Sequence, residues 1–551
     1  MNVFRLLARA AVLAAVSGPL AVAYGQVGPR DVDPDRLLEA ASTRPAGVVV
    51  YEWGKSAESR PIRAAMVAFP GPIPPGERPR LVIVAGLSAE QAASSLVAAA
   101  LPGELLTLAA ADPDLARLLK DHAVEILPLL AVDAMAAAAK SPTQARRKNA
   151  RPVDDDRDAM VDEDGPNDLD QDGVITQLRV PDPLGEWHVS EEDPRLLVKA
   201  DPKKGERGGW RLESEGLDDD RDGKIDEDGS GGVDFDRNFP HGRREFDRDS
   251  GVTAVSEPET KLLIDRILAT KPCVAVMVLG RRDNLVEAPP GTGDGKFFPA
   301  VENEDRPWFE DVVKLRKERL SFTKKLDDAG DGAFHQYAYA QLGVLAFASK
   351  VYEPPVAEKS ESLPTGKPPT TDDGRMLLDS DRRLGGKGFV PWRPFVHPTL
   401  GPVEIGGFVP GAYLTPTKTE IPGLVVNHAR FVLDVVRLFP RIELSELKAA
   451  PQGGGLVEIT AVVRNSGRIP TSLRIAQRTR TILPSRFEVD LPREAFVLGD
   501  PRTQLEPFGP GVGRKLRFVV RAAAGTEVAV RVWTEKAGSA EAKVVIPEGP
   551  R

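Results

Sequence analysis

The stretch GVDFDRNFP, from Gly232 to Pro240, decides the fold of this chain. It begins with the pattern of a buried strand and ends in the charged cluster Asp236-Arg237-Asn238. We expect the chain's chemically useful residues to converge on this cluster.

The surrounding segments predict an α/β domain. The run LVIVAGLSAEQAASSLVAAAL passes from a buried strand at 81–85, through a turn at Gly86, into an alanine-rich helix. The strand-like runs VEILPLLAV and VAVMVLG also alternate with helical stretches, which is typical of a largely parallel sheet. Active sites in such sheets lie at the carboxyl ends of the strands. Beyond Arg441, short alternating strands predict a β-sandwich over 441–551.

Three motifs carry a resemblance to the zinc metallocarboxypeptidases: GVDFDRNFP itself, the run SEPET at 256–260 and RRKNARP at 146–152. The resemblance covers residues 26–440. It implies a mixed, largely parallel sheet flanked by helices. It also implies an active site in which zinc has three protein ligands and a glutamate serves as general base.

The residues at the family's catalytic positions differ from those that the resemblance implies. Its His-x-x-Glu ligand pair falls on Ser88 and Gln91, its third ligand on Gly280, and its general base on Lys350. No histidine precedes His122, so a shifted alignment does not restore the first ligand. The sequence therefore predicts that zinc binding and the catalytic glutamate are lost. The alternative is that other residues have taken over these roles. Glu353 or Glu404 would then be the general base, or His188 and Glu191 would be metal ligands.

The anion-binding part of the family's site is better kept. Arg147 matches the arginine that stabilises the oxyanion, and Arg237 matches the clamp on the peptide's C-terminal carboxylate. A guanidinium suits this task because it binds a carboxylate through two hydrogen bonds. Asp236, in place of an asparagine, would repel that carboxylate and could instead pair with Arg237 or Lys350. Both arginines could equally be structural ion-pair partners.

Residues 141–231 interrupt the α/β pattern with acidic repeats. DDDRDAMVDEDG at 154–165 recurs as DDDRDGKIDEDG at 218–229, with DLDQDGVIT at 168–176 between them. Aspartates at alternate positions followed by glycine suit a calcium loop, although no copy has glutamate at its twelfth position. A solvated acidic loop is the alternative. The predicted calcium ligands are Asp154, Asp156, Asp158, Asp162, Asp168, Asp170, Asp172, Asp218, Asp220, Asp222 and Asp226.

Residues 1–25 read as a secretory signal peptide, so we expect a secreted or periplasmic protein without a membrane span. Cys273 is the single cysteine and excludes an intrachain disulfide. No basic arm for nucleic acid is present. The segment 355–395 is rich in Pro and Gly, and we predict that it leaves the domain core and runs over the surface as a surface excursion.

We expect a carboxypeptidase-like pseudoenzyme that binds peptide C-termini or other anionic ligands. One alternative is an active hydrolase with a relocated metal site. Another is a calcium-stabilised structural protein of the cell envelope.

Overall fold

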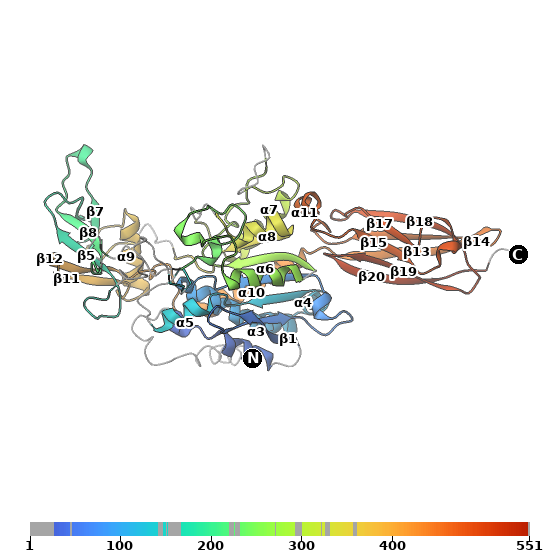
Figure 1. Cartoon of the computed structure of the whole chain (residues 1–551), viewed down its shortest axis with the longest axis horizontal. Helices are drawn as coiled ribbons and strands as arrows, with labels where there is room; N and C mark the ends of the chain where they lie inside the picture. The colour runs from blue at the N-terminus through green and yellow to red at the C-terminus, as the bar shows by residue number, and fades with distance from the viewer. Residues whose placement is uncertain are drawn as a thin grey trace.

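The computed structural model describes residues 27–43, 47–140, 147–149, 151–152, 167–219, 225, 232–269, 272–292, 300–320, 322–324, 331–355 and 361–548. The predicted signal peptide and the predicted calcium ligands Asp154, Asp156, Asp158, Asp162, Asp220, Asp222 and Asp226 lie outside these residues. An α/β domain occupies the middle of the molecule, with an antiparallel sheet at one end and a β-sandwich at the other (Figure 1).

The central sheet has six strands in the order β1-β2-β4-β3-β9-β10. Its strands are β1 (Val48–Lys55), β2 (Pro61–Val67), β3 (Arg80–Ala85), β4 (Ala123–Leu127), β9 (Cys273–Leu279) and β10 (Leu345–Ser349). β4, β3, β9 and β10 run parallel to one another, whereas β2 is antiparallel to both of its neighbours, β1 and β4. Every residue of β3, β9 and β10 is buried, which explains their continuous apolar sequences. The predicted mixed sheet is confirmed.

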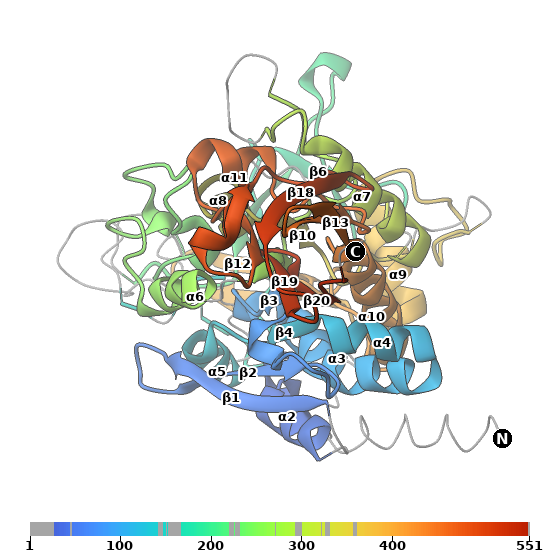
Figure 2. The same ribbon diagram turned by 90° about the vertical axis from the view of Figure 1, so that its right-hand side faces the viewer.

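Helices cover both faces of this sheet. They are α2 (Pro34–Ser42), α3 (Ala92–Ala111), α4 (Pro113–Asp121), α5 (Val132–Lys140), α6 (Pro258–Ala269), α7 (Arg306–Leu320), α8 (Phe334–Leu342) and α10 (Ile421–Arg437). Figure 2 shows α6 and α8 on one side of the sheet and α3, α4 and α10 on the other. Short 3-10 helices are η1 (Pro29–Asp31), η2 (Pro75–Glu77), η3 (Ala89–Gln91), η4 (Pro202–Lys204), η5 (Phe235–Arg237), η6 (Arg248–Ser250) and η7 (Arg493–Ala495).

One helical stretch of the described chain, Ala89–Ala111, is long and apolar enough to cross a membrane by length and composition alone. Most of it is buried inside the protein, where α3 packs against α2, α10 and the central sheet. Its apolar surface is therefore used by the core of this domain.

The second sheet joins two segments that are far apart in the sequence. Its order is β11-β12-β5-β8-β6-β7, and every pairing is antiparallel. The elements are β5 (Gln177–Pro181), β6 (Trp187–Val189), β7 (Leu197–Lys199), β8 (Trp210–Ser214), α9 (Asp372–Arg383), β11 (Phe389–His397) and β12 (Gly401–Phe408). The acidic insertion and the predicted surface excursion thus contribute to one lobe. Leu178 and Val180 of β5 pack against Val403 and Ile405 of β12, and neither segment could bury these residues alone.

The C-terminal part confirms the predicted sandwich. Two four-stranded antiparallel sheets have the orders β13-β14-β18-β16 and β17-β15-β19-β20. Their elements are β13 (Ile442–Gly453), β14 (Leu456–Asn465), α11 (Arg474–Thr479), β15 (Ser485–Val489), β16 (Phe496–Leu498), β17 (Arg502–Leu505), β18 (Gly513–Arg521), β19 (Glu527–Thr534) and β20 (Gly538–Val545). The sandwich has its own apolar core, in which Phe487 stacks on Phe518.

The sandwich is fastened to the α/β domain by buried polar contacts. The buried carboxylate of Asp305 accepts hydrogen bonds from Arg474 N (2.7 Å) and Ile475 N (3.1 Å) at the start of α11, and from the hydroxyl of Tyr339 (2.9 Å). Lys536 donates a hydrogen bond to the carbonyl of Cys273, the first residue of β9. The sandwich therefore contacts the amino ends of the parallel strands.

We predict that Asp305→Ala lowers the free energy of unfolding by about 2 to 4 kcal/mol, because it leaves two helix N–H groups and a tyrosine hydroxyl without their acceptor. Equilibrium urea unfolding measures the change. The control is Asp311→Ala, which removes a surface carboxylate paired with Lys314 and should cost at most about 0.5 kcal/mol. Equal losses in the two variants would contradict a fastening role for Asp305.

Candidate functional site

The three motifs that carry the family resemblance form one hydrogen-bonded unit. Asn149 pairs with Val233 through its backbone and through its side-chain oxygen, and its Nδ2 donates to Glu257 Oε2 at 2.6 Å. Asn238 is fully buried and donates to Ser256 Oγ at 3.0 Å, while it accepts a hydrogen bond from Thr260 Oγ1. The three motifs therefore meet at the stretch 232–240.

Two of the family's ligand positions meet at the carboxyl edge of the central sheet. A Cβ atom placed on Gly280, just after β9, would lie 3.7 Å from the side-chain oxygen of Gln91. The amide of Gly280 also bonds the carbonyl of Ser349, the last residue of β10. This edge is the opposite one from the sandwich, because β9 starts beside Lys536 and extends for about 20 Å.

These positions do not supply donors suited to zinc. Zinc in proteins is held by thiolates, imidazoles and carboxylates. Ser88 has a hydroxyl, which already accepts a hydrogen bond from Glu90 N. Gln91 has a neutral amide, and Gly280 has no side chain. The residues present do not fit a catalytic zinc, and we assign no hydrolytic step to them.

The lysine at the general-base position holds a neighbouring segment in place. Lys350 Nζ lies 2.5 Å from Glu353 Oε2 and donates to the carbonyl of Lys324 at 2.7 Å. Both side chains are nearly buried. Glu353 also accepts hydrogen bonds from Thr323 N and Lys324 N, at 3.1 Å each. The pair therefore anchors residues 323–324 at the end of β10. The expected pairing of Lys350 with Asp236 is wrong.

Glu353 is poorly placed to act as a displaced general base. Burial acts to raise the pKa of Glu353, but the hydrogen bond from Lys350 and those from two backbone amides outweigh it. They hold the pKa below its ordinary value of 4.5. A carboxylate that already accepts these bonds is a weak base for attacking water. Glu404 is engaged as well, in an ion pair with Arg179.

The histidine candidates are also dispersed. His397 is buried in the second lobe, where Nε2 lies 2.8 Å from the carbonyl of Gly216 and Nδ1 accepts the amides of Thr399 and Leu400. His188 lies on β6 and its Nε2 is 3.8 Å from Glu206. Neither histidine belongs to a metal-ligating group of three residues in the described part of the chain.

Arg147 lies at the candidate site, with one side exposed. Its Nε donates to Asp234 Oδ2 at 2.8 Å, and its side chain is 35% exposed. Arg281, which directly follows Gly280, has Nη2 3.7 Å from the same oxygen and is 34% exposed. Burial raises the pKa of Asp234, as does Asp236, against the opposing effect of the arginines. Sequence reasoning missed Arg281, although two arginines follow the buried run 273–279 after Gly280 alone.

Arg237 and Asp236 are engaged elsewhere. Arg237 pairs with Asp247 at 2.5 Å and with Asp249 at 3.4 Å. Asp236 accepts a hydrogen bond from Arg282 Nε at 2.7 Å and another from Phe334 N at 2.9 Å. The expected partners of Asp236, Arg237 and Lys350, are thus replaced by Arg282. This guanidinium offsets the charge that was expected to repel a ligand carboxylate.

The acidic loop 168–173 gathers carboxylates from two segments. Oxygen atoms of Asp168, Asp170 and Glu215 all lie within 4.8 Å of one another. Glu215 is fully buried and accepts hydrogen bonds from Leu169 N and Thr176 N. Burial raises the pKa of Glu215, against those bonds. Glu215 was missed because it lies far along the sequence from this loop. Of the other predicted ligands, Asp172 and Asp218 do not belong to this group of three.

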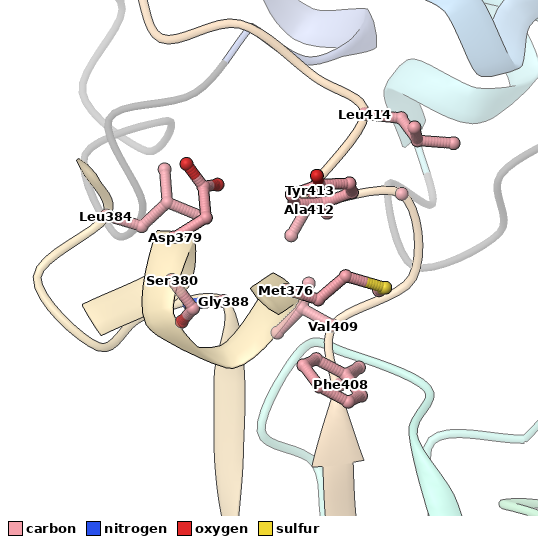
Figure 3. Close-up of a pocket in the computed structure, with 11 residues that line it drawn as sticks. Met376, Asp379, Ser380, Leu384, Gly388, Phe408, Val409, Ala412, Tyr413 and Leu414 are labelled. Carbon is pink, nitrogen blue, oxygen red and sulfur yellow. The ribbon is translucent and has the colours of Figure 1, made fainter. Parts of the chain in front are cut away.

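A pocket in the second lobe lies apart from these groups. Figure 3 shows Met376, Asp379 and Ser380 of α9 on one side and the segment from Phe408 to Leu414 on the other. It encloses about 360 Å³, part of it open to solvent. Its carboxylate is engaged, because both oxygens of Asp379 accept hydrogen bonds from Arg383. We assign no chemistry to this pocket.

We predict that Lys350→Met lowers the free energy of unfolding at neutral pH by about 3 to 5 kcal/mol, because Glu353 stays buried without its cation. The ionised carboxylate contributes its stability above pH 4.5, and this contribution is lost as the pH falls through the lowered pKa of the folded state. The difference between wild type and variant should therefore shrink in acid. Urea unfolding at several pH values measures it.

The matched control is Lys199→Met, which breaks an exposed pair with Glu186 and should cost at most about 0.5 kcal/mol at any pH. A loss in Lys350→Met as small as in this control would show that the buried pair does not hold the segment.

Comparison with known proteins finds two family models that match parts of this chain. The family model described as zinc carboxypeptidase matches residues 35–174, and a model described as a domain of unknown function matches 441–545. No curated protein matches the chain.

Among solved structures, thrombin activatable fibrinolysis inhibitor is 13% identical, with 79% of this chain and 80% of that chain covered and a TM-score of 0.41. Carboxypeptidase A from Helicoverpa armigera is 15% identical, with 70% and 77% covered and a TM-score of 0.38. A metallo-carboxypeptidase from Burkholderia cenocepacia is 12% identical, with 73% and 67% covered and a TM-score of 0.36. At such low scores these are distant likenesses. The family model matches the part of the chain that includes β1 to β4, and it confirms the resemblance to the zinc carboxypeptidases read from the sequence.

Proposed function

We propose that this protein is a non-hydrolytic member of its family that binds the C-terminal carboxylate of a peptide at Arg147. One observation carries the proposal. Where Gln91 and Gly280 come together at the carboxyl edge, the side chains lack zinc donors, while Arg147 and Arg281 face the same oxygen of Asp234. A site with cations and no base can hold an anion but cannot activate water.

The expected affinity is weak. A charge-assisted hydrogen bond contributes about 1.5 to 3 kcal/mol, and the loss of translational freedom on association offsets much of that. The guanidinium of Arg147 also shares its charge with Asp234. A dissociation constant between roughly micromolar and millimolar follows.

We further propose that the protein is exported by residues 1–25 and acts outside the cytoplasm in a binding or scaffolding role. The composition of that segment supports export. The sandwich supports scaffolding, because it is fastened to the edge opposite the candidate site and leaves that site facing away from it. A ligand could then be held without hindrance from the sandwich.

We predict that a peptide with a free C-terminus binds the purified protein at least about tenfold more tightly than its amidated form, since the amide removes the charge that Arg147 recognises. Arg147→Ala should abolish this difference. Isothermal titration calorimetry measures both affinities. Arg63→Ala is the control, because Arg63 lies on β2, is equally exposed and pairs with two carboxylates of α2. Equal binding of the two peptides would contradict the proposal. So would stoichiometric zinc in the protein or release of the terminal residue.

We propose calcium binding in the second lobe as an additional function that stabilises the fold. The proximity of Asp168, Asp170 and Glu215 supports it, because these carboxylates repel one another unless a cation lies between them. The loop also has the sharp turn that such sites use, with Gly173 at φ 90° and Gln171 at φ 56°. Arg393 offsets part of the charge through Asp170.

We predict that excess calcium raises the melting temperature above that in chelator, since a ligand of the native state adds about 2.7 kcal/mol at a hundredfold excess over its dissociation constant. Differential scanning calorimetry measures the shift. Asp168→Asn should remove most of it, whereas Asp201→Asn, an exposed turn residue of the same lobe, should not. A melting temperature that is indifferent to calcium would mean that the loop is only solvated.

A further inference from the structure

The two outer faces of the C-terminal sandwich differ in how their charges are paired. On the sheet β17-β15-β19-β20, every cationic side chain has a neighbouring carboxylate or aromatic ring. The partners are Glu488 for Arg502, Glu541 for Arg531, Glu527 for Lys543 and the ring of Trp533 for Arg486. Such cross-strand pairs balance the charge of this face.

The outer face of the other sheet, β13-β14-β18-β16, carries a group of cations. Ile459 and Ala461 of β14 are buried in the sandwich core, so Thr460 between them points outward. Residues directly opposite each other in antiparallel strands point to the same side, so the register gives the outward residues of β13 and β18. The cations on this face are Lys448, Arg464, Lys515, Arg517 and Arg521, and all five are exposed.

These cations outnumber the carboxylates beside them. Within the described residues, Arg517 pairs with Glu458 at 2.6 Å, whereas the other four cations have no carboxylate within ion-pair distance. Glu443 shares the face, and Glu446 lies exposed in the bulge of β13. Five cations against these three carboxylates leave a net charge of +2 on this face of the sheet.

Two exposed apolar side chains adjoin the cations. Val497 and Leu498 of the edge strand β16 are 56% and 47% exposed. Leu498 is opposite Val519 of β18, which lies between Arg517 and Arg521 on the outward side. Apolar and cationic side chains are thus neighbours, as they are on protein surfaces that bind a lipid interface.

The charge of the whole molecule is also unevenly distributed. Residues 441–551 contain 18 lysines and arginines against 12 aspartates and glutamates, a net charge of +6. Because the whole chain carries −9, residues 1–440 carry −15. The sandwich forms one end of the molecule (Figure 1), so an anionic surface attracts this end and repels the remainder.

We propose that the outer face of the sheet β13-β14-β18-β16 docks on a lipid bilayer that contains anionic phospholipids. The cations bind headgroup phosphates, and Val497 and Leu498 enter the boundary between headgroups and acyl chains. A cationic face alone suits any polyanion, but a soluble polyanion has no apolar phase in which these two side chains could be buried. Each lysine or arginine near such a membrane increases the affinity by about fivefold.

Vesicles test the docking directly. The purified protein is sedimented with vesicles of phosphatidylcholine alone and with vesicles that also contain phosphatidylglycerol. It should bind the anionic vesicles at least about tenfold more tightly, and the difference should fall as salt screens the charges. Dextran sulfate serves as a soluble polyanion for comparison.

Two double variants locate the face. Lys515→Ala with Arg521→Ala should weaken binding to anionic vesicles by about 25-fold, because two charges near the membrane are removed. The matched control is Arg531→Ala with Lys543→Ala, which removes the same charge from the opposite face of the sandwich. That face would lie about 10 Å farther from the bilayer, so salt screens its charges and the control should have a much smaller effect.

A third double variant tests the apolar contact. Val497→Ser with Leu498→Ser should weaken binding by at least about fivefold. This loss should persist in salt that screens the cations, because burial of apolar surface does not depend on charge. Thermal melts of all variants verify that each is folded.

Three outcomes would overturn the proposal. The first is no binding to vesicles, or equal binding to neutral and anionic vesicles. The second is an equal loss in the two charge variants, which would show that the net charge of the protein and not this face drives binding. The third is binding to dextran sulfate that requires Lys515 and Arg521 without binding to vesicles, which would assign the face to a soluble polyanion.

Discussion

The buried amide of Asn238 is the interaction on which the candidate site depends. Its Nδ2 donates to the carbonyls of Ser250 and Thr253 and to the hydroxyl of Ser256, and its oxygen accepts the hydroxyl of Thr260. A fully buried amide must find such partners, because each unpaired polar group would cost free energy. The requirement ties the stretch 232–240 to the start of α6. Asn149 completes the unit by joining Val233 to Glu257.

This network does not use the positions at which the resemblance places the metal ligands. The network uses residues at 149, 233–238 and 256–260, whereas the metal positions lie in the turns after β3 and β9. The side chains at positions 88 and 280 therefore do not enter these supporting bonds. The buried pair of Arg316 with Asp283 likewise braces the turn after β9 without any contribution from a metal.

The two appended parts occupy opposite ends of the molecule (Figure 1). The sandwich contacts the amino ends of the parallel strands through Lys536 and is bound to α11 through Asp305. The second lobe is built from the insertion and from residues 361–408, which pair through β5 and β12. In that lobe Arg179 lies over the rings of Trp210 and Trp392, at 4.9 and 4.8 Å, and pairs with Glu404. The lobe is thus held by contacts between residues that are distant in sequence.

The sequence by itself determined the features that depend on local pattern. Apolar runs at 81–85 and 273–279 specify strands buried on both faces, and such strands require a sheet covered by helices. Alternating patterns beyond residue 441 specify a sandwich with one apolar face per sheet. Ser88, Gln91 and Gly280 already exclude the usual zinc donors, because ligand chemistry is a property of the side chain itself.

Only the tertiary structure decided which charged groups meet. Arg237 pairs with Asp247 and Asp249, and Lys350 pairs with Glu353 rather than with Asp236. Glu215 joins Asp168 and Asp170 across many residues, and Arg281 joins Arg147 at Asp234. Ion pairs act over a few ångströms and in any direction, so the partner of a charged residue depends on which segments the fold places beside it. The order of residues along the chain does not show which charged side chains come within a few ångströms of one another.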